Sequence, residues 1–259
     1  RTIALLEGRL LVIRTQDLGG DKVMGGEGGP PEPNPILGCR SLRLSFRRMD
    51  SFRAQLRAVL RASALGPVRV MFPMVGSLAE WRRARQTLQE EAQVLRENGV
   101  PYDPNLPVGA MIEVPSAALI AGHLAQEADF FSIGTNDLIQ YCLAVDRVNA
   151  SVAPLYQPAH PAVLRLIRET VVAAAERKIE VNVCGEMAGD ASYTLLLLGL
   201  GVRALSTTPT ALPEIKRVIR ACAVADAEAI AAEALRKADG AEILALLRRK
   251  TEEIAPGAV

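Results

Sequence analysis

The chain has 259 residues, of which 49% are apolar, and its 30 Lys and Arg against 29 Asp and Glu give a formal net charge of +1. This balance argues against a nucleic-acid surface or a polybasic membrane anchor, and without a run of about 18 apolar residues we expect no membrane span. Two histidines, His123 and His160, are too few for a mechanism that needs several imidazoles. Four cysteines without CxxC spacing argue against a zinc knuckle or a disulfide framework and favour a reducing, cytoplasmic location.

Short β-branched runs alternate along the chain with longer amphipathic segments. The predicted strands are 10–15, 41–46 (the weakest), 68–74, 108–114, 130–135, 180–184 and 202–206. The predicted helices are 47–64, 77–98 (with Ser77 as a plausible N-cap), 116–128, 161–178, 190–198 and 211–223. This alternation predicts an α/β fold with a parallel sheet and helices outside it. The strand count favours a single (βα)8 barrel domain over residues 1–259 rather than an open sheet, although periodicity alone does not settle closure.

Two segments stand apart from this alternation. Residues 19–35 carry six glycines and four prolines, which predicts a long loop. We favour an excursion between barrel units, with a flexible lid or a phosphate-side loop as the alternative. Residues 224–259 predict two helices, 226–238 and 241–253, broken at Gly240 and packed on the outside of the barrel.

Polar residues collect at the carboxyl ends of the predicted strands, where the catalytic groups of a parallel barrel meet. They are Arg14, Glu113, Asn136, Asp137, Arg147 and Cys184. Two carboxylates, Glu113 and Asp137, can hold Mg²⁺, which takes the rest of its shell from water and substrate. Arginines supply planar donors for phosphate or carboxylate. The set therefore suits phosphoryl transfer from a phosphorylated acid, with the Cys184 thiol as a proton donor to carbon.

Each of these residues also has a simpler interpretation. Asp137 equally fits the cap of the following helix. A cysteine considered alone is usually a buried structural thiol, although the position of Cys184 at a strand end, in a Cys-Gly-Glu triplet, weakens that interpretation.

Several motifs resemble enzyme I of the bacterial sugar phosphotransferase system. They are VIRTQDLGGDK at 12–22, NPILGCRSLR at 34–43, LRAVLRAS at 56–63, MFPM at 71–74, GTNDLIQY at 134–141, AVDR at 144–147, LYQP at 155–158 and CGEMAGD at 184–190. The similarity runs in order from about residue 10 to about residue 220.

The resemblance implies a barrel that binds phosphoenolpyruvate (PEP) and forms a homodimer. In that family, the residues corresponding to Arg14 and Arg40 contact the substrate phosphate, and Arg61 matches a further arginine near the substrate. From spacing alone, Arg40 and Arg61 would be solvated charges. The remaining matches are Asn136, Asp137 and Arg147 at the substrate, Glu113 and Asp137 as Mg²⁺ ligands, and Cys184 as the group that exchanges a proton with C3 of the enolate.

The resemblance also implies parts that this sequence lacks. In the family, the phosphoryl group passes to a histidine of a separate N-terminal domain and then to a histidine-containing phosphocarrier protein in sugar uptake. Neither His123 nor His160 has the Gly-Gly-x-Thr-Ser-His setting of that acceptor. The family barrel has one more strand upstream, so we expect a fragment that begins inside the first helix and lacks the first strand. Thr207 and Thr208 replace the usual Met-Ser pair.

Two alternatives remain open on this evidence. Within the wider family, the alternative is the barrel of a pyruvate phosphate dikinase or PEP synthase, although AVDR and CGEMAGD are closer to enzyme I. From another functional class, it would be a catalytically idle dimerisation or metabolite-sensing module.

Overall fold

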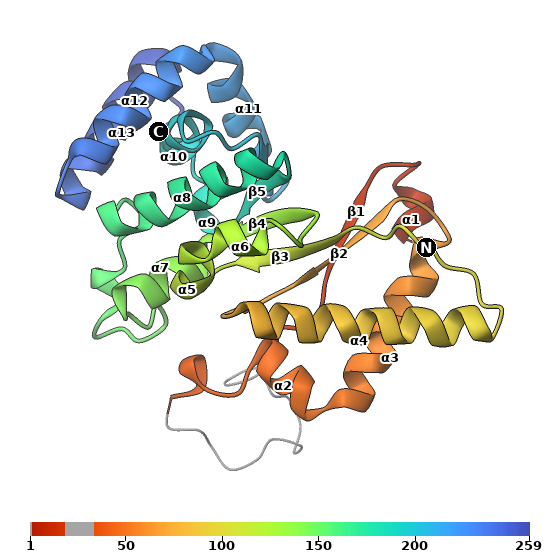
Figure 1. The fold of residues 1–259 in the computed structure, drawn as a ribbon. Helices are drawn as coiled ribbons and strands as arrows, with labels where there is room; N and C mark the ends of the chain where they lie inside the picture. Colours follow the sequence, from red (N-terminus) through yellow and green to blue (C-terminus); the bar gives the residue numbers. More distant parts are fainter. Residues whose placement is uncertain (1, 19–33) are drawn as a thin grey trace. The chain divides into compact units, whose positions relative to one another are not determined.

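The computed structural model describes residues 2–18 and 34–259 (Figure 1). These residues form two compact units, which we describe separately: unit 1 is 1–111 with 128–130, and unit 2 is 112–127 with 131–259. Most of the predicted loop 19–35 lies outside the described residues. The assignment of 1–259 to a single barrel domain stays a prediction.

Unit 1 consists of parallel strands with two long helices. Its elements are α1 (Thr2–Leu5), β1 (Leu11–Arg14), the short 3-10 turn η2 (Pro35–Leu37), α2 (Ser41–Arg47), α3 (Met49–Ser63), β2 (Val68–Phe72), α4 (Leu78–Glu97) and most of β3 (Val108–Ile112). β2 pairs in parallel with β1 on one side and with β3 on the other, with Val70 opposite both Ile13 and Val108. As expected, Ser77 caps α4, because its hydroxyl accepts a hydrogen bond from the Glu80 amide.

The core of unit 1 is built on a chain of aromatic rings. Phe46, Phe52, Phe72 and Trp81 meet edge to face in that order, with centroid separations of 6.1, 6.2 and 5.9 Å. Phe72 ends β2, while Phe52 and Trp81 come from α3 and α4. The chain of rings therefore fixes both helices against the carboxyl end of the strand.

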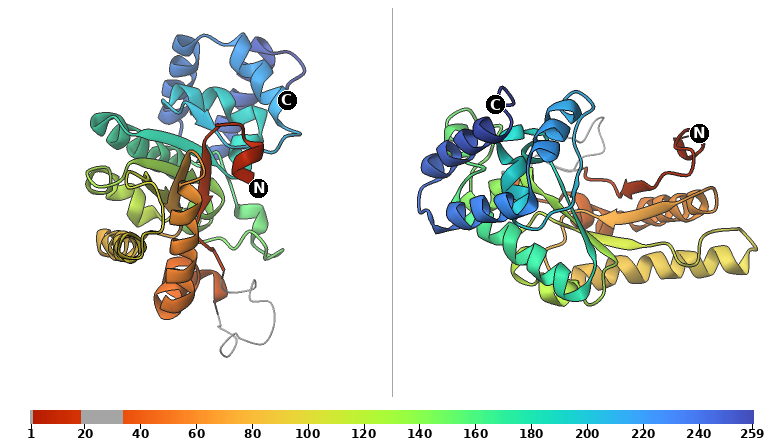
Figure 2. Two further views of the ribbon diagram at one scale, coloured as in Figure 1. Left: turned by 90° about the vertical axis from the view of Figure 1, so that its right-hand side faces the viewer. Right: turned by 90° about the horizontal axis from the view of Figure 1, so that it is seen from above.

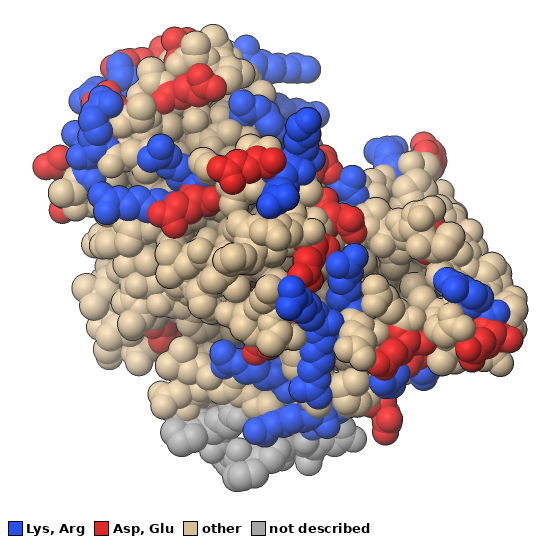
Figure 3. All heavy atoms as spheres, in the orientation of Figure 1, with Lys and Arg blue, Asp and Glu red and all other residues tan. Residues whose placement is uncertain are grey.

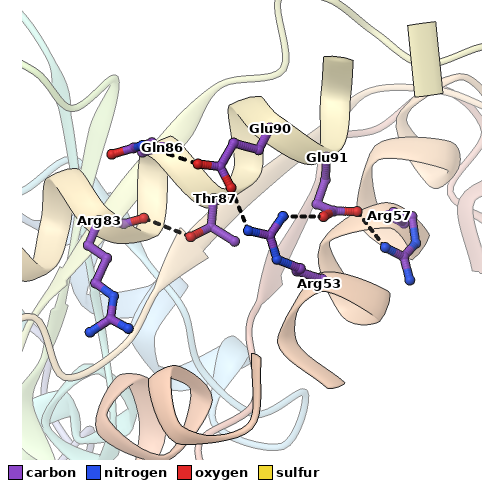
Figure 4. A network of polar contacts seen from close by, with 7 residues as sticks. All are labelled: Arg53, Arg57, Arg83, Gln86, Thr87, Glu90 and Glu91. Carbon is purple, nitrogen blue, oxygen red and sulfur yellow. Dashed lines mark hydrogen bonds and ion pairs between the residues drawn. The ribbon is translucent and has the colours of Figure 1, made fainter. Parts of the chain in front are cut away.

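A buried carboxylate also links α3 to α4 (Figure 4). The Glu91 side chain of α4 is 2% exposed, and it accepts hydrogen bonds from Arg53 and Arg57 of α3. Arg53 also bonds Glu90. Glu91 first, and then Glu90, raise the pKa of the Arg53 guanidinium. Burying a carboxylate is costly unless it is paired, and here two cations compensate it.

Unit 2 begins with the two short helices that follow β3. Its elements are α5 (Pro115–Leu119), α6 (Ala121–Leu124), most of β4 (Phe130–Gly134), α7 (Thr135–Leu143), the 3-10 turn η3 (Ala153–Leu155), α8 (Pro161–Arg177), β5 (Glu180–Cys184), α9 (Glu186–Gly189), α10 (Ala191–Gly199), β6 (Ala204–Leu205), α11 (Leu212–Ala221), α12 (Val224–Arg236) and α13 (Gly240–Ile254). β5 and β6 pair in parallel, with Val183 opposite Leu205.

The helix α10 lies at the centre of the helical part of unit 2. It is apolar on all sides and buried from Ala191 to Leu197. It packs against α11, α12 and α13, which surround it in Figures 1 and 2. Gly199 ends α10 where α12 approaches most closely, since a Cβ atom there would lie 2.0 Å from the Ala227 carbonyl oxygen. The predicted C-terminal helices are confirmed, but Gly240 begins α13 after the cap Asp239 rather than breaking a helix.

The α/β class and the parallel pairing are confirmed, and six of the seven predicted strands are present. The strand predicted at 41–46 is wrong, because these residues form the helix α2. In so short a segment, alternation of apolar and polar residues does not separate a strand from a helix with one buried edge. The helices α2, α7 and α9 were not predicted. Closure into a (βα)8 barrel, and the loss of a first strand, stay predictions.

The surface carries charges of both signs. In the face seen in Figure 3, Lys and Arg side chains are interspersed with Asp and Glu, in keeping with the net charge of +1. Within the described ranges, no helix combines the length and the apolar character that crossing a membrane requires.

Replacing Glu91 should test the buried network. Glu91→Gln keeps the shape of the side chain but leaves two guanidinium groups beside a neutral amide, so we expect the free energy of unfolding to fall by about 3 kcal/mol. Glu90→Gln is the matched control: its side chain is 42% exposed, and we expect a loss below about 1 kcal/mol. Urea denaturation measures both variants, and equal losses would contradict the assignment of Glu91 as the buried anchor.

Candidate functional site

The thiol of Cys184 lies where β5 ends beside the end of β4. Its Sγ donates to the Ile133 carbonyl at 3.5 Å and lies 3.6 Å from the Ser132 hydroxyl. Thr135 Oγ1 donates to the Cys184 carbonyl at 2.8 Å. Ser132 is 1% exposed, and its hydroxyl donates to Asn182 Oδ1 at 2.6 Å. These bonds hold the predicted catalytic thiol at the carboxyl end of its strand.

The turn after Cys184 requires a glycine. Gly185 has φ +91°, and a Cβ atom there would lie 2.5 Å from Thr135 Oγ1 and 2.8 Å from Asn136 Oδ1. An L side chain is therefore excluded both by conformation and by space. The missing side chain lets the start of α9 lie against the start of α7.

A pocket of about 370 Å³ opens beside this turn and brings two predicted site residues together. Its lining consists of Asn136, Arg147, Val148, Ala153, Tyr156 and Glu186. The Glu186 amide donates to Asn136 Oδ1 at 2.9 Å, which turns the Asn136 amide nitrogen toward the Glu186 carboxylate at 3.5 Å. The same carboxylate lies 3.6 Å from Arg147 Nη1. The pocket thus gathers the Asn136 amide and the Arg147 guanidinium around the Glu186 carboxylate.

Tyr156 forms one wall of the pocket and remains a phenol over the physiological pH range. Desolvation raises its pKa to about 12; Arg147 opposes this shift, while the charges of Glu186 and Asp137 add to it. The hydroxyl donates to the Asn136 carbonyl at 3.4 Å. Tyr156 therefore acts as a neutral hydrogen-bonding group in the pocket.

The two predicted metal ligands are both buried in unit 2. Glu113 directly follows β3 and is 2% exposed, and Asp137 lies in the first turn of α7 and is 9% exposed. Buried carboxylates at strand ends suit a hard cation such as Mg²⁺. Among the described residues, no three His, Cys, Asp or Glu side chains form a group able to hold a metal ion. A cation held by these two carboxylates would therefore complete its shell from water and substrate.

In unit 1, two of the three predicted arginines meet at Asp17. Arg40 Nε and Nη2 donate to the two Asp17 carboxylate oxygens at 3.2 and 2.8 Å, while Arg14 Nη1 lies 3.6 Å from Oδ2. Arg40 is 8% exposed, so the solvated position that its spacing suggested is wrong. Arg61 lies on the exposed side of the last turn of α3, and in the described part of the chain its side chain makes no hydrogen bond or ion pair.

Sequence reasoning assigned no role to three residues of these clusters: Asp17, Tyr156 and Glu186. All three stand inside the motifs VIRTQD, LYQP and CGE, but nothing in their spacing shows which side chain faces an arginine. The histidines have other roles: His160 caps α8 through Nδ1, which accepts from the Ala162 amide at 3.2 Å, and His123 lies exposed on α6. All four cysteines are free thiols.

The family model for the PEP-binding domain of PEP-utilising enzymes matches residues 1–224. The chain belongs to this family. The matched range includes every predicted site residue from Arg14 to Cys184, whereas nearly all of α12 and the whole of α13 lie beyond it.

Relatives of this PEP-binding domain are named phosphoenolpyruvate-protein phosphotransferase. The protein of Haemophilus influenzae is 47% identical over 243 residues, which cover 94% of this chain and 42% of the relative. That of Priestia megaterium is 47% identical over 223 residues, covering 86% and 39%, and that of Listeria monocytogenes is 42% identical over 248 residues, covering 96% and 43%. The chain thus spans about two fifths of the length of the curated relatives it matches.

The raised pKa of Tyr156 in the PEP-binding domain predicts a loss of stability at high pH. An unfolded tyrosine ionises near pH 10, whereas the folded phenol holds its proton to about pH 12. The contribution of the Tyr156 phenol to the free energy of unfolding is therefore fully present below about pH 10 and is lost as the pH rises toward 12. After a discount for its partial exposure, we expect the wild-type protein to lose about 1 kcal/mol more than Tyr156→Phe between pH 8 and pH 11.

Urea denaturation at the two pH values measures this difference. The comparison within each variant is the control, because at pH 8 the phenol is neutral in both the folded and the unfolded state. Equal losses in the wild-type and Tyr156→Phe proteins would contradict the pKa assignment.

Proposed function

We propose that the chain binds PEP in a Mg²⁺-dependent manner and provides the donor half of a phosphoryl transfer. The acceptor is a histidine of a separate N-terminal domain, from which the group passes to a histidine-containing phosphocarrier protein in sugar uptake. The observation that carries the proposal is the match to the PEP-binding domain over 1–224, a range that contains the complete set of predicted site residues. The names of the relatives favour this transferase over a dikinase, a synthase or an idle module.

The proposed roles follow from the chemistry of the side chains in each unit. In unit 1, Arg14, Arg40 and Arg61 supply cations for the substrate phosphate. In unit 2, Asn136 and Arg147 bind substrate oxygens, and the assignment is supported by the pocket that both side chains line.

Glu113 and Asp137 are the proposed Mg²⁺ ligands, and Asp137 also contacts the substrate. Bound Mg²⁺ supplies positive charge against the phosphate and enolate oxygens. Both carboxylates are buried, at 2% and 9% exposed, and a bound cation would compensate their charge.

Cys184 is the proposed acid. When the bond between phosphorus and the enol oxygen breaks, the phosphoryl group moves to the acceptor histidine and the enolate of pyruvate remains. The Cys184 thiol then gives its proton to C3, which yields pyruvate and a thiolate that takes a proton back from solvent. The bonds around Cys184 support this role because they fix the sulfur at the strand end.

Location and assembly complete the proposal. We infer a cytoplasmic protein, a homodimer formed through this domain, and a (βα)8 barrel over residues 1–259. These inferences rest on the resemblance to enzyme I.

Titration calorimetry with PEP tests the binding step. We expect heat of binding with Mg²⁺, little or none after its removal with a chelator, and a Kd about tenfold to a hundredfold higher for Arg147→Ala, because a charged hydrogen-bonding group contributes about 1.5–3 kcal/mol. Arg165→Ala, on the exposed side of α8, is the matched control and should bind like the wild-type protein. Failure of the wild-type protein to bind PEP in either condition would sink the proposal.

Removing the thiol separates binding from turnover. Cys184→Ala should keep the PEP Kd within about twofold but slow pyruvate formation by about 10²–10⁴ when the N-terminal domain is supplied, because a positioned acid contributes that much. Cys222→Ala, a thiol beyond β6, is the control. If Cys184→Ala turns over at the wild-type rate, the thiol is structural.

A further inference from the structure

The backbone on both sides of Asp17 is fixed by hydrogen bonds. The segment that carries it follows β1 and is tied to three other segments. The Thr15 amide donates to the Met71 carbonyl at 3.1 Å, the Gln16 amide donates to Gln55 Oε1 at 3.2 Å, and the Ser41 amide donates to the Leu18 carbonyl at 2.8 Å. The last of these bonds joins the residue after Asp17 to the residue after Arg40. The backbones of both partners are therefore fixed relative to each other before their side chains pair.

The pair itself is buried and bidentate. The Asp17 side chain is 3% exposed and that of Arg40 is 10% exposed. Both carboxylate oxygens accept from one edge of the guanidinium, at 3.2 and 2.8 Å. A bidentate contact fixes the plane of the guanidinium as well as its position. Arg14 lies 3.6 Å from the same carboxylate, with a side chain that is 41% exposed.

The turn before Arg40 is braced separately. Arg43 Nη1 donates to the Leu37 and Gly38 carbonyls at 2.9 and 3.1 Å. These bonds secure the backbone and the turn without the Asp17 carboxylate. What it adds is the orientation of the guanidinium.

We propose that Asp17 is a positioning residue: its carboxylate fixes the Arg40 guanidinium, and restrains Arg14, in the orientation in which they receive the substrate phosphate. This role rests on the proposed function. An arginine side chain loses rotamer freedom when it binds an anion, and Asp17 imposes that order in advance. The carboxylate also lowers the positive charge of the cluster, so orientation and attraction act in opposite directions. Removing Asp17 therefore distinguishes the two effects.

The positioning is testable without any ligand. In ¹H–¹⁵N spectra of the arginine side chains, the Nε–H group of Arg40 should give a resolved signal protected from exchange, assigned by its loss in Arg40→Lys. Asp17→Asn should abolish the protection, whereas Asp50→Asn, which removes the same charge from an exposed position on α3, should leave it unchanged. A protected Arg40 signal in Asp17→Asn would overturn the proposal.

Binding of two ligands tests the consequence for the phosphate. With Mg²⁺ present, Asp17→Asn should raise the Kd of PEP at least tenfold and leave the Kd of oxalate, a dianion without phosphate, within twofold. An unchanged or tighter Kd for PEP would overturn the proposal, since the carboxylate would then only offset charge. A parallel loss for both ligands would also overturn it, because that result indicates general damage to the fold.

A second variant covers the case in which Asp17→Asn does not fold. Arg40→Lys keeps the charge but cannot make the bidentate pair, and it should show the same selective loss of PEP over oxalate; an unchanged PEP Kd would overturn the proposal. The two hypotheses fail differently. A wild-type chain that does not bind PEP refutes the proposed function, whereas wild-type binding that persists in Asp17→Asn refutes the inference alone.

Discussion

Unit 1 depends on one constraint: a carboxylate taken out of water must be compensated by cations at close range. The chain meets it twice with the same arrangement. Glu91, 2% exposed, lies between Arg53 and Arg57, and Asp17, 3% exposed, lies between Arg40 and Arg14. The first cluster joins two helices and the second joins the end of β1 to the start of α2. In both clusters, the fold itself fixes the orientation of the arginine side chains.

In unit 2 the corresponding constraint is space rather than charge. The strands β4 and β5 end side by side, and the turn after β5 is possible only because Gly185 has no side chain to meet Thr135 and Asn136. One glycine therefore lets the Glu186 amide reach the Asn136 side chain. The chain next to the predicted acid and one predicted substrate ligand are brought together by backbone geometry.

Six strands could be predicted from the sequence, because short apolar runs of five to seven residues alternate regularly with longer amphipathic segments, as in a parallel α/β fold. The prediction was wrong at 41–46, where the alternation of apolar and polar residues comes from a helix with one buried edge. The strand β6 is shorter than predicted. Among the site residues, Arg14, Glu113, Asp137 and Cys184 could be found as polar groups at strand ends. Arg40 and Arg61 required the family resemblance. Asp17, Tyr156 and Glu186 escaped, because a partner in space leaves no periodic signal in the chain.

The two clusters of unit 1 also differ in net charge. Arg53 and Arg57 face Glu90 and Glu91, so those four side chains are neutral together and an added anion would gain nothing there. Arg14, Asp17 and Arg40 sum to one positive charge at the end of a strand. Two arginines without Asp17 would attract a phosphate more strongly but would have to be ordered by it. With Asp17, attraction is reduced and order is supplied in advance, which suits the proposed role of aligning a phosphoryl group that must then leave.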